Sequence, residues 1–157
     1  MKFYEKNSFW KRQEQQQYKE EKAGAFRCAH CHAFVVVNEY IGTKNRNHCN
    51  LCLWSKHVDI QKGDRAAVCQ GGMEPIGLTL KREGISRYGE LMLIHICKSC
   101  EKVSINRIAA DDSTSEIMRV FEESQKGSYL SKVLEEQGIY LLTEDDSQEL
   151  KTQLFGR

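Results

Sequence analysis

Three C-x-x-C pairs are the strongest chemical signal in the sequence: Cys28/Cys31, Cys49/Cys52 and Cys97/Cys100. Two residues between the cysteines let the backbone curl around one ion, so that both sulfurs reach it at about 2.3 Å while intervening amides donate hydrogen bonds to the sulfurs. Cys69 brings the total to seven. Because an odd number fits a set of closed disulfides poorly, the cysteines predict zinc binding.

Two tetrahedral zinc ions need eight ligands, so one histidine should complete the set. The chain has five candidates: His30, His32, His48, His57 and His95. We expect His57, because the spacing Cys49-x2-Cys52-x4-His57 allows a short loop to return an imidazole to the knuckle. His30 and His32 lie in or against the first knuckle, where solvated turn positions are expected. For His48 and His95 we expect supporting or exposed roles rather than ligation.

The pairing of the ligands has two solutions. The preferred solution has these two sets: Cys28, Cys31, Cys97 and Cys100 for one ion, and Cys49, Cys52, His57 and Cys69 for the other. It rests on the segments "FRCAHCHAFVV" and "IHICKSCEKVSI", which share a strand–knuckle–strand shape, as the two halves of a zinc ribbon do. The alternative joins Cys28/Cys31 to Cys49/Cys52, which matches a C-x2-C-x(15–20)-C-x2-C ribbon pattern.

The elements around these ligands predict a small α+β fold with a zinc-ribbon-like β core. Residues 26–37 place a cysteine pair between aromatic and β-branched residues, a composition typical of two short strands that meet at a tight turn. Residues 76–82 and 90–97 are a second apolar pair and predict a hairpin. The middle of the chain should therefore be strand and loop.

The pattern becomes helical after residue 112. Ser113 and Glu116 form a capping box in front of an apolar stripe: Ile117, Val120 and Phe121. Two further short helices are expected, at 128–138 and 143–155. Because an exposed stripe of this size is unfavourable, we expect it to pack on the zinc domain or on a protein partner. The predicted divisions are a polar N-terminal arm or helix at 1–25, a zinc domain at 26–112 and a helical C-terminal extension at 113–157.

Composition excludes several classes of protein. With 40% hydrophobic and 29% charged residues among 157, the chain has the composition of a soluble globular protein. Its beginning lacks the apolar run of a secretory signal and no later stretch is long enough to span a bilayer, so we expect no membrane contact and a reducing cytoplasm. The formal net charge of +1 gives no argument for nucleic acid.

The segments "RNHCNLCLWSKHVD", "GDRAAVCQGGMEPIG" and "HICKSCEKVSINRIAADD" resemble the bacterial and archaeal RNHCP-domain family, named for its Arg-Asn-His-Cys-Pro motif. The resemblance covers about residues 26–112 and leaves 113–157 outside it. It implies zinc and a compact domain but no particular activity. The chain differs from the family pattern at three positions: Asn50 replaces the proline, and His32 and Glu101 stand where a knuckle glycine would be common. Asparagine tolerates the turn conformations involved, so the fold should be retained.

Polar residues close to the knuckles suggest a role in RNA binding. The residues selected for an RNA-facing surface are Lys44, Arg46, Asn47, Lys56 and Arg107, with Asn106, Arg65, Trp54 and Tyr88 as further candidates. Arginine and lysine pair with phosphate and aromatic rings stack on unpaired bases, so we favour a non-catalytic module that contacts RNA or the ribosome.

Two other interpretations remain open. In the first, the chain is a zinc-stabilised protein-interaction domain, and Arg46 and Arg107 pair with nearby carboxylates: Asp59, Asp64, Asp111 or Asp112. In the second, it is a zinc hydrolase in which Cys49, Cys52 and Cys69 hold a metal with an open position for water, beside a base such as Asp59, Asp64 or Glu74.

Overall fold

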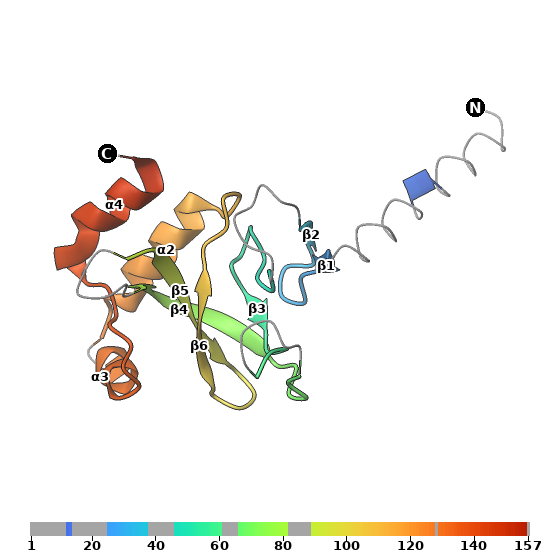
Figure 1. Ribbon diagram of the computed structural model, residues 1–157, viewed down its shortest axis with the longest axis horizontal. Helices are drawn as coiled ribbons and strands as arrows, with labels where there is room; N and C mark the ends of the chain where they lie inside the picture. Colours follow the sequence, from blue (N-terminus) through green and yellow to red (C-terminus); the bar gives the residue numbers. More distant parts are fainter. Residues whose placement is uncertain are drawn as a thin grey trace.

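A four-stranded antiparallel sheet forms the centre of the computed structural model, which describes residues 12–13, 25–37, 46–60, 66–81, 89–127 and 129–156 (Figure 1). The strands are, in spatial order, β3 (Ser55–Lys56), β4 (Gly72–Leu80), β5 (Leu91–Cys97) and β6 (Val103–Arg107). β6 is thus an edge strand of this sheet. The fold is a small α+β fold, as predicted.

The hairpin expected from residues 76–82 and 90–97 is β4 with β5. Their register runs from Leu80 opposite Leu91 to Met73 opposite Cys97, with a shift between Pro75 and Gly77. A proline cannot donate a ladder hydrogen bond, and its place beside an irregularity of the sheet fits that restriction. The end of β5 therefore delivers Cys97 next to the beginning of β4.

A separate two-stranded ribbon, β1 (Phe26–Arg27) and β2 (Phe34–Val35), surrounds the first cysteine knuckle. Figure 1 shows this ribbon on the opposite side of the sheet from the C-terminal helices. The strand–knuckle–strand shape predicted for residues 26–37 is confirmed, and β5 and β6 give the last cysteine pair the same local shape.

The helices are α2 (Thr114–Ser124), α3 (Tyr129–Glu136) and α4 (Ser147–Phe155), the last preceded by a 3-10 turn, η1 (Glu144–Asp146). The three predicted helical segments are confirmed. Ser113 caps α2, because its hydroxyl accepts a hydrogen bond from the backbone N–H of Glu116 at 3.3 Å. Within the described segments, no helix combines the length and the apolar character that crossing a bilayer requires.

The helices cover both faces of the sheet. The stripe of α2 is buried with Leu78 and Leu93 on one face, and Leu134 of α3 is buried with Ile94 on the other. The expectation that the helices pack on the domain that contains the cysteine pairs is confirmed, and the apolar stripe of α2 is therefore buried within the chain. Leu53, which follows the second knuckle and is 0% exposed, belongs to the same core as α2. The knuckle is therefore anchored in the main core.

Candidate metal centres

The three knuckles have the same backbone geometry. In each, the N–H of the residue after the second cysteine donates to the carbonyl of the first cysteine, at 2.9 Å in all three. The N–H of the first cysteine donates to the carbonyl five residues on, at 2.8 to 2.9 Å. This turn requires a positive φ directly after the second cysteine, and the residues there are His32 (φ 65°), Leu53 (φ 63°) and Glu101 (φ 65°). All three are in the left-handed region that favours glycine.

Glu101→Gly should therefore stabilise the protein. Glu101 is exposed, so the substitution removes little packing, and it relieves left-handed strain of about 1–2 kcal/mol while adding about 0.5–1 kcal/mol of unfolded-state entropy. A net gain of about 1 kcal/mol should appear in urea unfolding of the zinc-loaded protein. Glu101→Ala, which retains the Cβ, should give no such gain. Equal stabilisation by both variants would mean that the side chain, rather than the backbone conformation, is responsible.

The first cluster consists of Cys28, Cys31, Cys49 and Cys52, whose sulfurs all lie within 4.8 Å of one another. The distance between the sulfurs of Cys28 and Cys52 is 3.6 Å, and that between Cys31 and Cys49 is also 3.6 Å. All four cysteines are free thiols. A tetrahedral zinc ion with Zn–S bonds of about 2.3 Å places its sulfurs about 3.8 Å apart, so the cluster has the size of a zinc site.

Local contacts support the first cluster. The backbone N–H groups of Cys31 and Leu51 donate to the sulfurs of Cys28 and Cys49, at 3.5 Å and 3.4 Å. Such hydrogen bonds stabilise thiolates. His30 of the first knuckle stacks on Trp54 beyond the second, with ring centroids 4.0 Å apart and planes within 3°. His30 is thus not a simple solvated turn residue, and one face of Trp54 is covered within the chain.

The second cluster consists of His57, Cys69, Cys97 and Cys100, with ligand atoms again within 4.8 Å of one another. The sulfurs of Cys69 and Cys97 are 3.7 Å apart, and the sulfur of Cys100 is 3.3 Å from Nδ1 of His57. His57 follows β3, Cys69 precedes β4, and the third knuckle joins β5 to β6. The cluster therefore ties together the ends of all four strands of the main sheet.

Gly71 makes room for the second cluster. A Cβ atom at this position would lie 2.5 Å from Oγ of Ser99 and 2.9 Å from the sulfur of Cys97. Both distances are shorter than real contacts of a Cβ, so only glycine lets the segment after Cys69 approach the third knuckle this closely.

The ionisation of the thiols requires a cation nearby. In the first cluster, burial raises the pKa of Cys52 and of Cys49, and the neighbouring cysteines raise them further. In the second, burial opposes ionisation of Cys97, but hydrogen bonds from the backbone of Cys100 and Ser99, together with those of the His57 and Cys100 side chains, outweigh it and bring the pKa of Cys97 down to about 6. Several thiolates cannot share a site without a compensating positive charge. A divalent cation provides it, and each cluster could hold one.

The preferred pairing of the ligands is wrong, although the eight predicted ligands are the residues that form the two clusters. Cys28/Cys31 lies with Cys49/Cys52, which is the alternative indicated by the ribbon spacing. The physical reason is that β5 and β6 pair within the main sheet, where β3 and β4 bring His57 and Cys69 to the third knuckle. The first and third knuckles thus have a similar local shape but belong to different clusters.

The open hydrolase site is likewise not formed. Cys69 lies with Cys97 and Cys100, apart from Cys49 and Cys52, and His57 completes its set of four. Each cluster therefore offers a full tetrahedral set of protein ligands, whereas a catalytic zinc retains an open position for water or substrate.

Arg46 is not on an RNA-facing surface, because it is buried, at 2% exposure, between two aspartates. Its Nη1 donates to Asp111 at 2.7 Å and its Nη2 to Asp112 at 2.8 Å. Asp112 also pairs with Nε2 of His48 at 2.7 Å and accepts the N–H of Ala109 at 2.8 Å. The ion-pair alternative is thus confirmed for Arg46. We call these residues, Arg46, His48, Asp111 and Asp112, the arginine network; it joins the second knuckle to the loop after β6.

His95 is a buried structural residue and not a ligand. Its Nε2 donates to the carbonyl of Leu53 at 2.7 Å, and its Nδ1 lies 2.9 Å from Nδ2 of Asn106. Burial lowers the pKa of His95 to about 3, with a smaller contribution from His48, so the ring is neutral near pH 7. Spacing alone could not reveal this role, because the partner Leu53 is remote in sequence.

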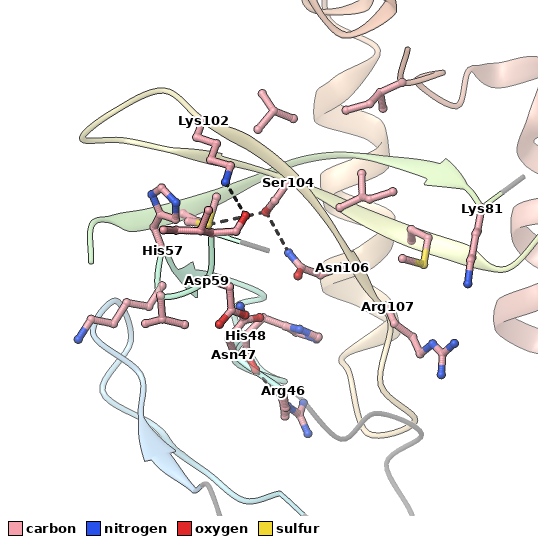
Figure 2. A pocket seen from close by; sticks show the side chains of 18 residues that line it. Arg46, Asn47, His48, His57, Asp59, Lys81, Lys102, Ser104, Asn106 and Arg107 are labelled. Carbon is pink, nitrogen blue, oxygen red and sulfur yellow. Dashed lines mark hydrogen bonds between the residues drawn. The ribbon is translucent and has the colours of Figure 1, made fainter. Parts of the chain in front are cut away.

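Several of the remaining residues of the predicted RNA surface line one cavity. Asn47, Lys56 and Arg107 line a cavity of about 560 Å³ beside β6, and Arg107 also pairs with Glu90 at 3.1 Å (Figure 2). Lys44, Arg65, Tyr88 and Asp64 lie outside the described residues. The cavity adds two lysines that sequence inspection missed, Lys81 and Lys102. They come from the β4–β5 and β5–β6 connections, and only folding brings them to the same cavity as Lys56.

Comparison with known families matches the RNHCP domain to residues 23–118. No curated protein and no solved structure matches the chain significantly. The matched segment contains all eight ligand residues, the arginine network and the beginning of α2. Because it spans more than half of the 157 residues, the chain belongs to the RNHCP domain family.

Proposed function

We propose that both clusters hold zinc and that the chain is a non-catalytic module which contacts RNA. The observation that carries the zinc assignment is the presence of two closed sets of four ligands, one made of four thiols and the other of three thiols and an imidazole. Thiolate and imidazole donors in tetrahedral sets favour zinc over harder cations. A reducing compartment such as the cytoplasm would keep these thiols available for the metal.

The zinc ions in this proposal stabilise the fold rather than perform chemistry. Four protein ligands leave no position for a water molecule, and thiolate-rich sites reduce the acidity of any water that binds. Each ion would join segments that are distant in sequence: the first joins the β1–β2 ribbon to the second knuckle, and the second joins the strand ends of the main sheet.

The cavity beside β6 supports the RNA part of the proposal. Lys56 and Lys81 line it, and among the described residues their ammonium groups have no hydrogen-bond or ion-pair partner. Lys102 donates to the carbonyl of Ile60 at 2.9 Å, an acceptor that carries no formal charge. Positive charges along a cavity attract phosphates, and a metal-stabilised frame would hold them at fixed positions.

A protein-interaction module is the second candidate, favoured by the edge position of β6. Ile105 at the middle of this strand is 43% exposed, and the cavity extends along the whole strand. An extended acidic peptide could add to such an edge as a fifth strand.

Salt dependence distinguishes the two candidates. The wild type should bind single-stranded RNA with an affinity that falls as salt rises, with a log–log slope of magnitude about 2 if three phosphates are engaged. The double variant Lys56→Gln/Lys81→Gln should reduce the magnitude of the slope by about 1.4 while zinc content is unchanged. Lys151→Gln, on the exposed side of α4, is the matched control and should leave the slope unaltered. Fluorescence anisotropy measures the binding, and sedimentation with ribosomes tests whether ribosomal RNA is the target. Absence of salt-dependent binding would give first place to the peptide-binding candidate.

A further inference from the structure

The amide of Asn106 has a defined orientation in the cavity. The carbonyl of Leu53 can only accept, so Nε2 of His95 carries the proton that it donates there. Nδ2 of Asn106 lies 2.9 Å from Nδ1 of the same ring, and because an amide NH2 can only donate, Nδ1 is the acceptor. That NH2 also lies 3.4 Å from Oγ of Ser104. Oδ1 of Asn106 is left as an acceptor without a hydrogen-bond partner in the described part of the chain, and Asn106 lines the cavity.

His48 provides a second polar atom without a partner. Its ring is 1% exposed and lines the same cavity, and its Nε2 is engaged by Asp112. Within the segments that the structure describes, Nδ1 of His48 makes no hydrogen bond. No side-chain nitrogen or oxygen in these segments is both fully buried and without a hydrogen-bond partner. The two rings, His48 and His95, lie with centroids 6.1 Å apart, so Asn106 and His48 flank the same buried histidine.

The rest of the cavity combines apolar walls with cations. Apolar residues that border it are Val58, Ile60, Met73, Met92, Val103, Ile105 and Ile139, and one carboxylate, that of Asp59, belongs to a further lining residue. Figure 2 shows Lys102 and Lys81 at opposite ends of the cavity, with Asn106 between them. Its volume, about 560 Å³, is within the range of ligand pockets. Apolar walls can contact the faces of a flat aromatic ring, and oriented polar atoms can form hydrogen bonds with its edge. Cations at the ends of the cavity can bind phosphates on either side of such a ring.

We propose that the cavity takes one unpaired RNA base that carries an exocyclic amino group, with Oδ1 of Asn106 accepting from that amino group and Lys56, Lys81 and Lys102 contacting adjacent phosphates. This inference rests on the proposed RNA contact and specifies how the contact is made. His48 is a second contact for the base edge. The cavity would therefore select by base and not only by charge.

The first test changes the RNA and leaves the protein as wild type. Short oligoribonucleotides that differ only in one central nucleotide, cytidine, uridine or an abasic unit, carry the same number of phosphates. The cytidine probe should bind about tenfold or more tightly than the abasic probe, because stacking and burial of a base are worth about 1–3 kcal/mol. It should bind about threefold to tenfold more tightly than the uridine probe, which lacks the amino group. A second pair, adenosine and inosine, covers the case in which a purine fits better.

The second test changes the residue that reads the base. Asn106→Leu should abolish the discrimination between amino-bearing and amino-free probes and leave the salt slope unchanged. Because this substitution also removes the donor to His95, zinc content and circular dichroism must show that the variant is folded. Gln137→Leu makes a similar change from amide to leucine at an exposed position that does not line the cavity, and this matched control should keep the discrimination.

The outcomes separate this inference from the proposal on which it rests. Suppose that RNA binds with a salt slope, but the abasic probe binds equally well or the protein distinguishes neither cytidine from uridine nor adenosine from inosine. The proposal of a base pocket is then wrong, and the proposal of phosphate contacts remains. If no RNA binds, both are wrong. If free cytidine monophosphate or adenosine monophosphate binds as tightly as the corresponding oligonucleotide, the RNA assignment is overturned and the cavity belongs to a free nucleotide.

Discussion

Replacing Cys28 or Cys49 with serine should remove the same zinc ion, and replacing Cys97 or His57 should remove the other. The wild type should contain two ions per chain, and each single variant one. The double variant Cys28→Ser/Cys49→Ser should still contain one ion, whereas Cys28→Ser/Cys97→Ser should contain none. This follows from the membership of the two clusters, and metal analysis of the purified variants measures it.

The loss of either ion should have a large effect on stability. Structural zinc contributes roughly 10–16 kcal/mol of binding free energy in zinc-finger peptides, which is comparable with the whole stability of a small domain, about 5–15 kcal/mol. Chelation should therefore unfold the region from β1 to β6 in a transition followed by circular dichroism. The result that would contradict this is a chelated protein with an unchanged unfolding midpoint, in which case the clusters are reduced thiols without a structural ion.

The two ions should differ in what they hold. The first cluster fastens the β1–β2 ribbon and the second knuckle, whose Leu53 is buried in the same core as α2. The second cluster joins the ends of the four strands. Hydrogen exchange on the Cys28→Ser variant should thus show lost protection in the ribbon and retained protection in β4 and β5, because the second ion still joins the ends of these two strands in addition to their own pairing and the helices.

Much of the fold was accessible from local signals in the sequence. The hairpin, the knuckles and the helix after Ser113 each depend on residues close together in the chain, such as the cap at Ser113 and the apolar stripe behind it. The ligand set was predictable for the same reason, since C-x-x-C is a local motif and only one further histidine was needed. The occurrence of Glu101 where a glycine would be common is also explained locally, because the knuckle requires the left-handed conformation at this position whichever residue occupies it.

The interactions that the sequence did not reveal are those between distant segments. Which knuckle shares an ion with which depends on strand order, and nothing near Cys97 indicates that His57 lies beside it. Arg46 provides a second case. Its charge and its position before a knuckle suggested an exposed residue that contacts phosphate. Its partner Asp112, however, is distant in sequence, and the ion pair between them is buried. The one signal in the sequence was the pair of adjacent aspartates after "NRIAA".

Asp112→Ala should be among the most destabilising substitutions outside the ligands. The side chains of Arg46 and Asp112 are both 0% exposed, so the change removes the fully buried carboxylate partner of the guanidinium and leaves Asp111, whose side chain is 43% exposed. It also removes the acceptor for Nε2 of His48 and for the N–H of Ala109. Breaking a buried pair by removing one partner costs about 3–5 kcal/mol. Urea unfolding of the zinc-loaded variant measures this cost.

Asp111→Ala is the matched control, since it removes the exposed partner of the same arginine and should cost about 1 kcal/mol or less. If the two aspartate variants were equally stable, the buried pair would contribute no more than a surface one. Arg46→Gln separates the structural role from an RNA contact. It should lower stability as Asp112→Ala does, because Asp112 then loses its buried counter-charge. Under conditions where the variant remains folded, the salt slope of RNA binding should equal that of the wild type, because the guanidinium is buried against the aspartates and its charge is already compensated.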